Sequence, residues 1–342
     1  MVAIDGHSKS KPLLEGLQIA VVIPCFNEAQ AIEKVVRDFR IVLPEADIYV
    51  YDNNSTDGTS AIAQKAGAFV RNEPRQGKGF VVRRMFADID ADVYVMTDGD
   101  NTYDALRARE MVQRLVADGL DMVNGIRVET DDSSPYRPGH KFGNAMLTWF
   151  VRMVFGRGVR DMMSGYRVFS RRFVKSFPAT STGFEVETEL TAHALDLVMP
   201  FAEIETDFSE REIGSESKLR TFTDGFRILW TIIKLMKRER PVTLFGILAV
   251  LTFIPSISSY IPILFRYFET GVVPRYPTLI IATGLGVIAI LCVVCAMILD
   301  TVTYGRKEQK RLHYLAIPGV LATQGLIRKA RARAARKLPK TG

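Results

Sequence analysis

Two acidic side chains separated by one glycine follow a short apolar run. Asp98, Gly99 and Asp100 come almost directly after residues 93–96, VYVM. A strand that ends in two carboxylates offers oxygen ligands at one edge of a sheet, and hard divalent cations that clamp phosphates prefer such oxygens. Taken alone the pattern is weak, because acidic turns containing glycine are common in solvated loops. The rest of the chain must decide between a metal site and an ordinary turn.

The elements that would position this pair follow from an alternation of strand-like and helical patterns. We predict strands over 18–23, 48–51, 93–96 and 122–125, and helices over 29–41, 57–66 and 105–117. This order favours an α/β fold with a mostly parallel sheet and helices on both faces. Ligands of such sheets bind beyond the carboxyl ends of the strands. Polar motifs follow the first two strands as well, so three motifs should meet at one edge.

Two long uncharged runs lie near the C-terminus. Residues 242–265 and 276–299 each contain 24 residues without a charged side chain. At about 1.5 Å per residue, either run would cross a hydrocarbon core of roughly 30 Å as a helix. A buried core helix is the alternative, but such runs are uncommon in soluble domains. We therefore expect a membrane segment over 241–303 with transmembrane helices near 242–265 and 277–301.

Basic side chains flank this expected hairpin. Residues 218–240 contain seven Lys and Arg against two acidic residues, and residues 304–342 contain eleven against one. This bias predicts a multi-pass protein of the inner (plasma) membrane, with the catalytic domain and both termini in the cytoplasm. Nucleic-acid binding is the competing interpretation of the Arg-rich tail. Next to a membrane hairpin we expect lipid headgroups as the partner and no nucleic acid.

The other boundaries follow from composition and periodicity. Residues 1–16 resemble a disordered lead, and residues 17–220 would form the catalytic domain. Apolar side chains recur at helical spacing from 221 to 237, which predicts an amphipathic helix over 221–240 in the membrane interface. Packing of this helix against the soluble domain is the alternative. Residues 304–342 would be a basic cytoplasmic tail.

Several motifs together resemble a known enzyme family. Residues 22–28 (VIPCFNE), residues 52–59 (DNNSTDGT) and the Asp98–Asp100 pair occur in the order and spacing of family 2 glycosyltransferases with the GT-A fold. Residues 161–167 (DMMSGYR) are similar to a segment of polyprenyl-phosphate glycosyltransferases, and residues 214–219 (GSESKL) resemble an element of dolichyl-phosphate mannose synthases. Two apolar C-terminal helices are similar to those of bacterial undecaprenyl-phosphate glucosyltransferases.

The resemblance implies a site for a nucleotide-sugar donor. Pro24, Phe26 and Glu28 would line the pocket for the base and ribose, since a carboxylate accepts hydrogen bonds from ribose hydroxyls. Asp52 would accept a hydrogen bond from a base N–H. For Asp57 we favour a structural role as the N-cap of the following helix.

The metal follows from the same resemblance. Asp98 and Asp100 would hold Mg²⁺ or Mn²⁺ against the donor diphosphate, where a cation offsets the charge that builds on the leaving group. Many relatives have a Gln two residues after the second acid. Thr102 stands at this position here and offers a neutral oxygen of shorter reach.

The second substrate implied is a polyprenyl phosphate, whose oxygen is already ionised near neutral pH. A general base is therefore less necessary, and positive charge is needed to hold two anions together. Arg127, after its strand, is the candidate at the reacting groups. Candidates for the acceptor phosphate, each with a solvated surface position as its alternative, are Arg137, Lys141, Arg167 and Lys218, with His140 beside them.

Three alternating glutamates complete the list of candidates. Glu185, Glu187 and Glu189 do not share one face of a helix. We expect one of them to touch a donor hydroxyl and the others to be solvated.

The sequence thus predicts inverting transfer of a hexose from a nucleotide diphosphate sugar, UDP-glucose favoured, to polyprenyl phosphate at the cytoplasmic membrane face. GDP-mannose and UDP-N-acetylhexosamine are alternative donors. A processive polysaccharide synthase is disfavoured because two spanning helices leave little room for a polymer channel. An inactive GT-A scaffold is disfavoured by the complete set of donor motifs. Expected partners are the nucleotide sugar, polyprenyl phosphate and membrane lipids; the architecture resembles tetrameric relatives, so a homo-tetramer is possible.

Overall fold

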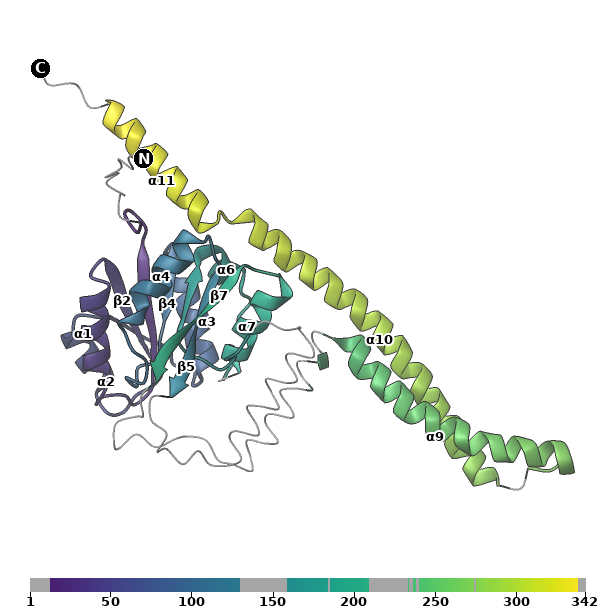
Figure 1. Cartoon of the computed structure of the whole chain (residues 1–342). Helices are drawn as coiled ribbons and strands as arrows, with labels where there is room; N and C mark the ends of the chain where they lie inside the picture. Colours follow the sequence, from purple (N-terminus) through teal and green to yellow (C-terminus); the bar gives the residue numbers. More distant parts are fainter. Residues whose placement is uncertain are drawn as a thin grey trace, which may run out of the picture. The chain divides into compact units, whose positions relative to one another are not determined.

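The computed structural model describes residues 13–129, 159–183, 185–208, 233, 236–237, 240–273 and 275–337. They fall into two compact units (Figure 1). The first contains the sheet with its helices and also residues from 310 onward, and the second contains two long apolar helices. Some predictions lie outside the described residues: Arg137, His140, Lys141, Lys218 and most of the interfacial helix.

The first unit is built on a seven-stranded sheet with the order β3-β2-β1-β4-β6-β5-β7. Among these strands, β6 alone runs antiparallel to its neighbours, β4 and β5. The mostly parallel α/β sheet predicted from the sequence is confirmed. The bounds are β1 Ile19–Cys25, β2 Ala46–Asp52, β3 Phe69–Asn72, β4 Val93–Met96, β5 Met122–Glu129, β6 Arg167–Ser170 and β7 Phe201–Phe208.

Helices cover both faces of this sheet. One hydrophobic cluster lies under α1 and α4, and a second lies under α3, α6 and α7. Strand β1 supplies both, because side chains alternate along a strand: Val21 and Ile23 enter the first cluster, and Ala20 and Val22 the second. The helix bounds are α1 Ile32–Val42, α2 Thr59–Lys65, α3 Lys78–Asp88, α4 Arg107–Ala117, α6 Arg171–Ser176 and α7 Val186–Asp196.

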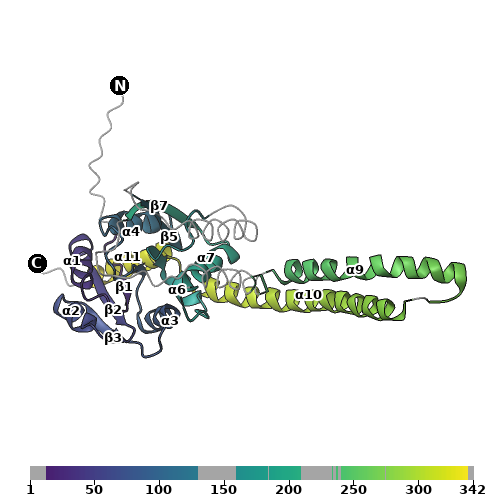
Figure 2. The same ribbon diagram turned by 90° about the horizontal axis from the view of Figure 1, so that it is seen from below.

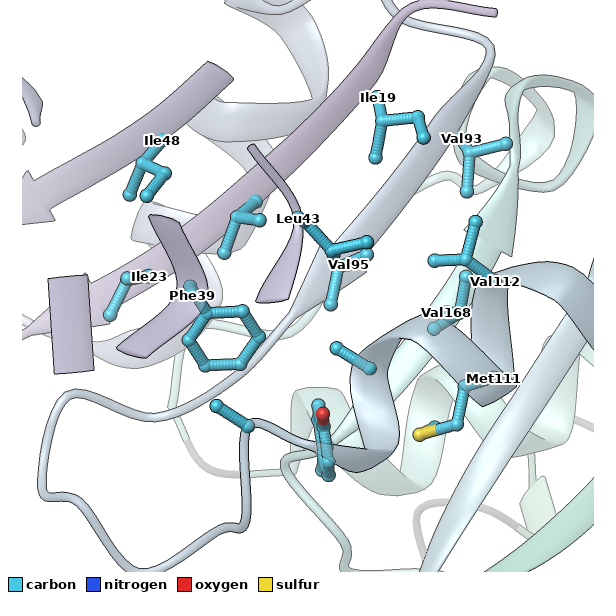
Figure 3. Packing of buried hydrophobic residues seen from close by; sticks show 14 of the residues in the cluster. Ile19, Ile23, Phe39, Leu43, Ile48, Val93, Val95, Met111, Val112 and Val168 are labelled. Atoms are coloured by element: carbon cyan, nitrogen blue, oxygen red, sulfur yellow. The ribbon is translucent and has the colours of Figure 1, made fainter. Parts of the chain in front are cut away.

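Helix α1 shows how the sequence pattern becomes a core. Ile32, Val35, Val36 and Phe39 recur at helical spacing and are all buried, as the pattern predicts. Figure 3 shows the Phe39 ring among side chains of β1, β2 and β4. The register of β1 against β2 pairs Cys25 with Asp52, so both strands end at the same edge. The core thereby fixes the loops that follow these strands.

The second unit is a pair of apolar helices, α9 Pro241–Thr270 and α10 Tyr276–Ala316. Both are long and apolar enough to cross a membrane, by length and composition. They lie side by side (Figure 2), and the Ser256 hydroxyl donates to the Ala282 carbonyl oxygen at 2.7 Å. Helix α10 extends well past residue 301 and is followed by α11 Val320–Lys337. The domain boundaries given above stay predictions.

Candidate functional site

The loops after β1 and β2 are bonded to each other. The backbone N–H of Asn27 donates to the Ser55 hydroxyl at 2.8 Å, and the Thr56 N–H donates back to the Asn27 side-chain oxygen at 2.9 Å. The Glu28 N–H donates to the Thr59 hydroxyl at 2.9 Å. These bonds give the first two polar motifs one shared geometry. Pro24, Phe26 and Glu28, predicted at the donor base and ribose, are partly buried at this edge.

Two aspartates hold the second loop from within. Asp52 is 5% exposed, and it accepts hydrogen bonds from the Ser55 N–H at 2.9 Å and from the Ser60 hydroxyl. Asp57 accepts from the Thr59 N–H at 3.1 Å at the start of α2 and from the Ala29 N–H at 3.0 Å. Both carboxylates therefore shape the loop, and the base contact of Asp52 stays a prediction.

The Asp98–Asp100 turn lies at the same edge, after β4. Asp100 is 6% exposed, and the Thr102 hydroxyl donates to its Oδ1 at 2.7 Å. A Cβ on Gly99 would stand 2.5 Å from the Cys25 sulfur, so a side chain between the two aspartates would force the Cys25 side chain to move. Asp98 keeps 25% of its side chain exposed. The turn thus presents Asp98 outward and packs Asp100 with Thr102 inward.

Lys78 meets this turn, although the sequence analysis did not select it. Its ammonium lies 2.5 Å from the Asp98 Oδ1 and 2.6 Å from the Glu187 Oε1. Burial alone would lower the pKa of Lys78, but the two carboxylates raise it above its ordinary value. Burial raises the pKa of Glu187, which Lys78 opposes. Lys78 is therefore charged and aimed at the proposed metal ligand.

The expectation that most of the three glutamates are solvated is wrong. Glu187 is 6% exposed and Glu189 is 7% exposed. Glu189 accepts a hydrogen bond from the Ser181 N–H at 2.8 Å and so pins the loop before α7. The glutamates that touch no donor hydroxyl were expected to face solvent. Helix α7, however, packs on the second core cluster and its Glu187 meets Lys78, so both of these positions are buried.

A signal for Lys78 does exist in its flanking glycines. A side chain at Gly77 would collide with the Thr182 carbonyl oxygen, and one at Gly79 with the Ser181 carbonyl oxygen. Gly77 also has φ of 136°, which side-chain-bearing residues rarely adopt. The start of α3 therefore packs backbone to backbone against the loop before α7, which brings Lys78 to Glu187.

Arg127 at the end of β5 forms a bidentate ion pair. Its Nε lies 2.7 Å from the Asp161 Oδ2, and its Nη2 lies 2.9 Å from the Oδ1. Burial would raise the pKa of Asp161, but the hydrogen bonds and charge of Arg127 lower it. Burial would lower the pKa of Arg127, but Asp161 raises it. The Arg127 side chain stays 27% exposed.

One short segment brings these two ion pairs into a single site. Asp161 holds Arg127, and four residues later Gly165 abuts the Asp98 carboxylate so closely that any Cβ would collide with it. The Gly165 N–H donates to the Tyr103 hydroxyl at 2.8 Å, which fixes the segment. Burial raises the pKa of Tyr103, so its hydroxyl stays protonated.

Arg167 does not fit the predicted contact with an acceptor phosphate. Its side chain is completely buried, and its guanidinium donates to the backbone oxygens of Met162 and Ser164 and to the Thr191 hydroxyl. Burial lowers its pKa. Arg167 begins β6, which lies between β4 and β5. Its hydrogen bonds to the backbone oxygens of Met162 and Ser164 hold the 161–165 segment in place.

The side-chain oxygens of the Asp98–Asp100 turn are the ligand type that a hard divalent cation prefers. Asp98 and Asp100 supply oxygens, and the glycines at 99 and 165 leave no side chain in front of them. Within the described ranges there is no group of three or more His, Cys, Asp or Glu that could hold a metal. The remaining ligands would therefore be donor phosphate oxygens and water, and Thr102 supports Asp100.

The family is shown by comparison with known proteins. Residues 20–177 match the model of Glycosyl transferase family 2. Glycosyltransferase AglJ of Haloferax volcanii is 33% identical over 234 residues, which cover 67% of this chain and 75% of that protein. Protein RfbJ of Shigella flexneri is 54% identical over 129 residues, 38% of this chain and all of that protein. The chain belongs to the family 2 glycosyltransferases.

Another relative has a more specific description. The dolichyl-phosphate hexose transferase of Haloferax volcanii is 31% identical over 224 residues, which cover 65% of this chain and 95% of that protein. Among solved structures, glucosyl-3-phosphoglycerate synthase of Mycobacterium tuberculosis in complex with Mn²⁺, uridine diphosphate and phosphoglyceric acid has a TM-score of 0.55 at 21% identity. The match covers 67% of this chain and 80% of that one, and it shows the GT-A fold.

Proposed function

We propose that this glycosyltransferase transfers a hexose from a nucleotide diphosphate sugar to polyprenyl phosphate at a membrane surface. The observation that carries the proposal is the meeting of two charge centres: Asp98 with Lys78, and Arg127 with Asp161, joined by the 161–165 segment. Two anionic substrates need such an arrangement, because their mutual repulsion must be offset while they are held in contact. The dolichyl-phosphate hexose transferase relative supports a hexose and a lipid phosphate.

In the donor half of the site, the bonded loops after β1 and β2 would hold the base and ribose. Asp98 and Asp100 would hold Mg²⁺ or Mn²⁺, which when bound offsets charge on the diphosphate. Lys78 adds a positive charge beside Asp98 and would bind a phosphate oxygen as the leaving nucleotide gains charge. UDP-glucose is the favoured donor, and GDP-mannose and UDP-N-acetylhexosamine are the alternatives.

In the acceptor half, Arg127 would hold the lipid phosphate in line with the anomeric carbon. Its pairing with Asp161 fixes the guanidinium plane, so little side-chain freedom is lost when the phosphate binds. The phosphate oxygen attacks without a general base, and one displacement inverts the anomeric configuration. Arg137, Lys141 and Lys218 are proposed to add positive charge at the same phosphate.

The apolar helices would hold this site at a membrane. Insertion of α9 and α10 in the inner membrane, with the catalytic unit and both termini in the cytoplasm, follows the excess of Lys and Arg in the flanks. A lipid phosphate lies at this same interface, so anchoring raises its effective concentration at the site.

The test is an assay with purified full-length protein, polyprenyl phosphate in liposomes, Mn²⁺ and a panel of nucleotide sugars. We expect one glycolipid whose mass equals the acceptor plus a single hexose. Asp100→Asn should lower the rate at least about 100-fold, while Asp118→Asn, at the exposed C-cap of α4, should leave it unchanged. A ladder of masses would instead indicate a processive synthase. No product with any donor, and no donor hydrolysis, would indicate an inactive scaffold.

A further inference from the structure

Two cations belong to the Asp98 carboxylate. The Lys78 ammonium lies 2.5 Å from its Oδ1, and the divalent cation of the proposed function would bind the same carboxylate. Like charges that share one carboxylate repel each other, and the repulsion is larger in a partly buried site than in water. Lys78 therefore opposes a divalent cation at Asp98, although both attract the same group.

The second oxygen of Asp98 does not separate the two cations. Oδ2 lies beside the backbone of Gly165, where the lack of a side chain leaves space at the oxygen. A cation bound there would still lie near the ammonium on Oδ1, at about the 4–6 Å over which neighbouring charges act strongly on each other. The opposition therefore holds whichever oxygen the divalent cation takes.

The backbone that carries Lys78 is fixed, so the ammonium has little freedom to leave. The Lys78 side chain is 9% exposed. Gly77 and Gly79 on either side lie so close to the carbonyl oxygens of Thr182 and Ser181 that a Cβ at either glycine would collide with them. The Gly79 N–H also donates to the Thr182 oxygen at 3.1 Å. Folded structure thus keeps this lysine beside the turn.

Glu187 gives the ammonium a second carboxylate. Its Oε1 lies 2.6 Å from the Lys78 Nζ, so Lys78 stays paired when Asp98 turns to another cation. The two carboxylates and the ammonium together leave a single negative charge, which a divalent cation would change to a single positive charge. A diphosphate between the cation and Lys78 supplies the negative charge that both then lack.

We propose that Lys78 prevents Asp98 from holding a divalent cation tightly on its own, and that the nucleotide diphosphate removes this opposition. The cation and the nucleotide then each bind tightly only in the presence of the other, which is positive coupling and has the same size in both directions. Glu187 is a positioning residue, because it retains the lysine while Asp98 changes partner. The inference rests on the proposed function for the diphosphate, but it concerns binding and not transfer.

A purely structural ion pair predicts the opposite change in affinity. If Lys78 only held Asp98 in position, its loss would release the Asp98 side chain and weaken cation binding. If Lys78 opposes the cation, its loss strengthens cation binding in the absence of nucleotide. The direction of the change in Mn²⁺ affinity therefore separates the two roles.

The test measures Mn²⁺ binding to the full-length protein in detergent by electron paramagnetic resonance, with and without uridine or guanosine diphosphate. Lys78→Met removes the ammonium and keeps much of the aliphatic chain. Lys78→Met combined with Glu187→Gln removes one positive and one negative charge, so the net charge of the group stays that of the wild type. Arg84→Met removes a 48% exposed cation from the same helix, α3, and is the matched control.

We expect Lys78→Met and the double variant to bind Mn²⁺ without nucleotide at least about tenfold more tightly than the wild type, because a like charge beside the site is lost. The better of the two nucleotides should tighten Mn²⁺ binding at least about fivefold in the wild type, and by a smaller factor in both variants. Arg84→Met should match the wild type within about twofold, because an exposed charge is screened by water and salt.

Three results would overturn the inference: Mn²⁺ binding that is unchanged or weaker in both variants, a gain in Lys78→Met that the double variant lacks, or no effect of either nucleotide on Mn²⁺ binding to the wild type. If Lys78→Met does not fold, the double variant decides, because it leaves no buried charge without its partner. A wild type that binds Mn²⁺ and nucleotide as expected but forms no glycolipid would contradict the proposed function and leave this inference standing.

Discussion

Lys78 and Arg127 are held by carboxylates from other segments of the chain. Lys78 lies at the start of α3 and meets Asp98 and Glu187, and Arg127 at the end of β5 meets Asp161. Each pairing orients a cation that would otherwise be a flexible side chain. Such pre-oriented charge lowers the cost of bringing two anionic substrates together.

Replacement of Lys78 tests this arrangement directly. Lys78→Met should lower kcat/KM for the donor about 10²–10³-fold, the size typical of one lost electrostatic contact in an active site. Lys78→Met combined with Glu187→Gln removes both buried charges and separates the loss of activity from a loss of stability. Lys65→Met, on the exposed end of α2, is the matched control. Near-wild-type kcat/KM in a folded Lys78→Met protein would contradict the role.

The Arg127–Asp161 pair makes stability depend on pH. The pKa of Asp161 is lowered in the folded protein from its ordinary value of 3.8. Its ionised form therefore stabilises the fold above pH 3.8, and this contribution is lost as the pH falls through the lower folded pKa. Asp161→Asn should cost about 3 kcal/mol at pH 7.

Urea unfolding in detergent, followed by circular dichroism, checks this difference. The gap between wild type and Asp161→Asn should be constant from neutral pH to about pH 5 and shrink below 3.8. Asp118→Asn, at the exposed C-cap of α4, should show no such trend. A gap that is the same at pH 7 and pH 3 would show that it does not come from the ionised carboxylate of Asp161.

At the scale of elements, the site depends on three loops fixed by packed strands and helices. Asn27, Asn54 and Asn101 each follow a strand end and adopt positive φ, of 55°, 67° and 59°. Asn adopts this conformation more readily than other residues that carry a side chain, and packing of the strands beneath supports these turns. Helix α1 supplies part of that support, because its buried face packs under β1, β2 and β4.

The contribution of the buried face of α1 to the free energy of unfolding can be measured with two substitutions in this helix. Phe39→Ala should lower the free energy of unfolding by about 3–5 kcal/mol, because it removes a buried ring and leaves a cavity. Ile41→Ala, at a position 76% exposed, should change it by less than about 0.5 kcal/mol. Both values come from urea unfolding. Equal effects would show that the α1 face does not carry the core.

At the scale of the whole molecule, the distribution of Lys and Arg around the two apolar helices predicts the membrane topology. Glu269 lies at the end of α9 and Lys329 in α11. In intact cells, with the three native cysteines replaced, Glu269→Cys should react with a membrane-impermeant maleimide and Lys329→Cys should react only after permeabilisation. Labelling of Lys329→Cys from outside would reverse the topology.

Periodicity and local motifs were enough to predict the parallel sheet, the buried face of α1 and the shared edge of the polar loops. The pairing of Lys78 with Glu187 and the buried state of Arg167 could not be predicted from them, because each depends on contacts between residues far apart in sequence. Lys78 and Glu187 are separated by 109 residues.

The docking of residues 310–327 on the first unit was missed for another reason. The Tyr314 hydroxyl donates to the Asp121 carboxylate at 2.7 Å, and Val320 belongs to the same hydrophobic cluster as the buried faces of α1 and α4. The tail was judged by its net charge, while its few apolar positions decide where its first half packs.

The contact between Gln324 and Leu13 spans 311 residues. The ribosome makes Leu13 and β1 before the two apolar helices, and it makes Gln324 after them. The contacts of Val320 and Tyr314 with the first unit therefore form only after the apolar helices have been synthesised. The order of synthesis thus places the last contacts of this unit after the hairpin, although the strands of its sheet are made before it.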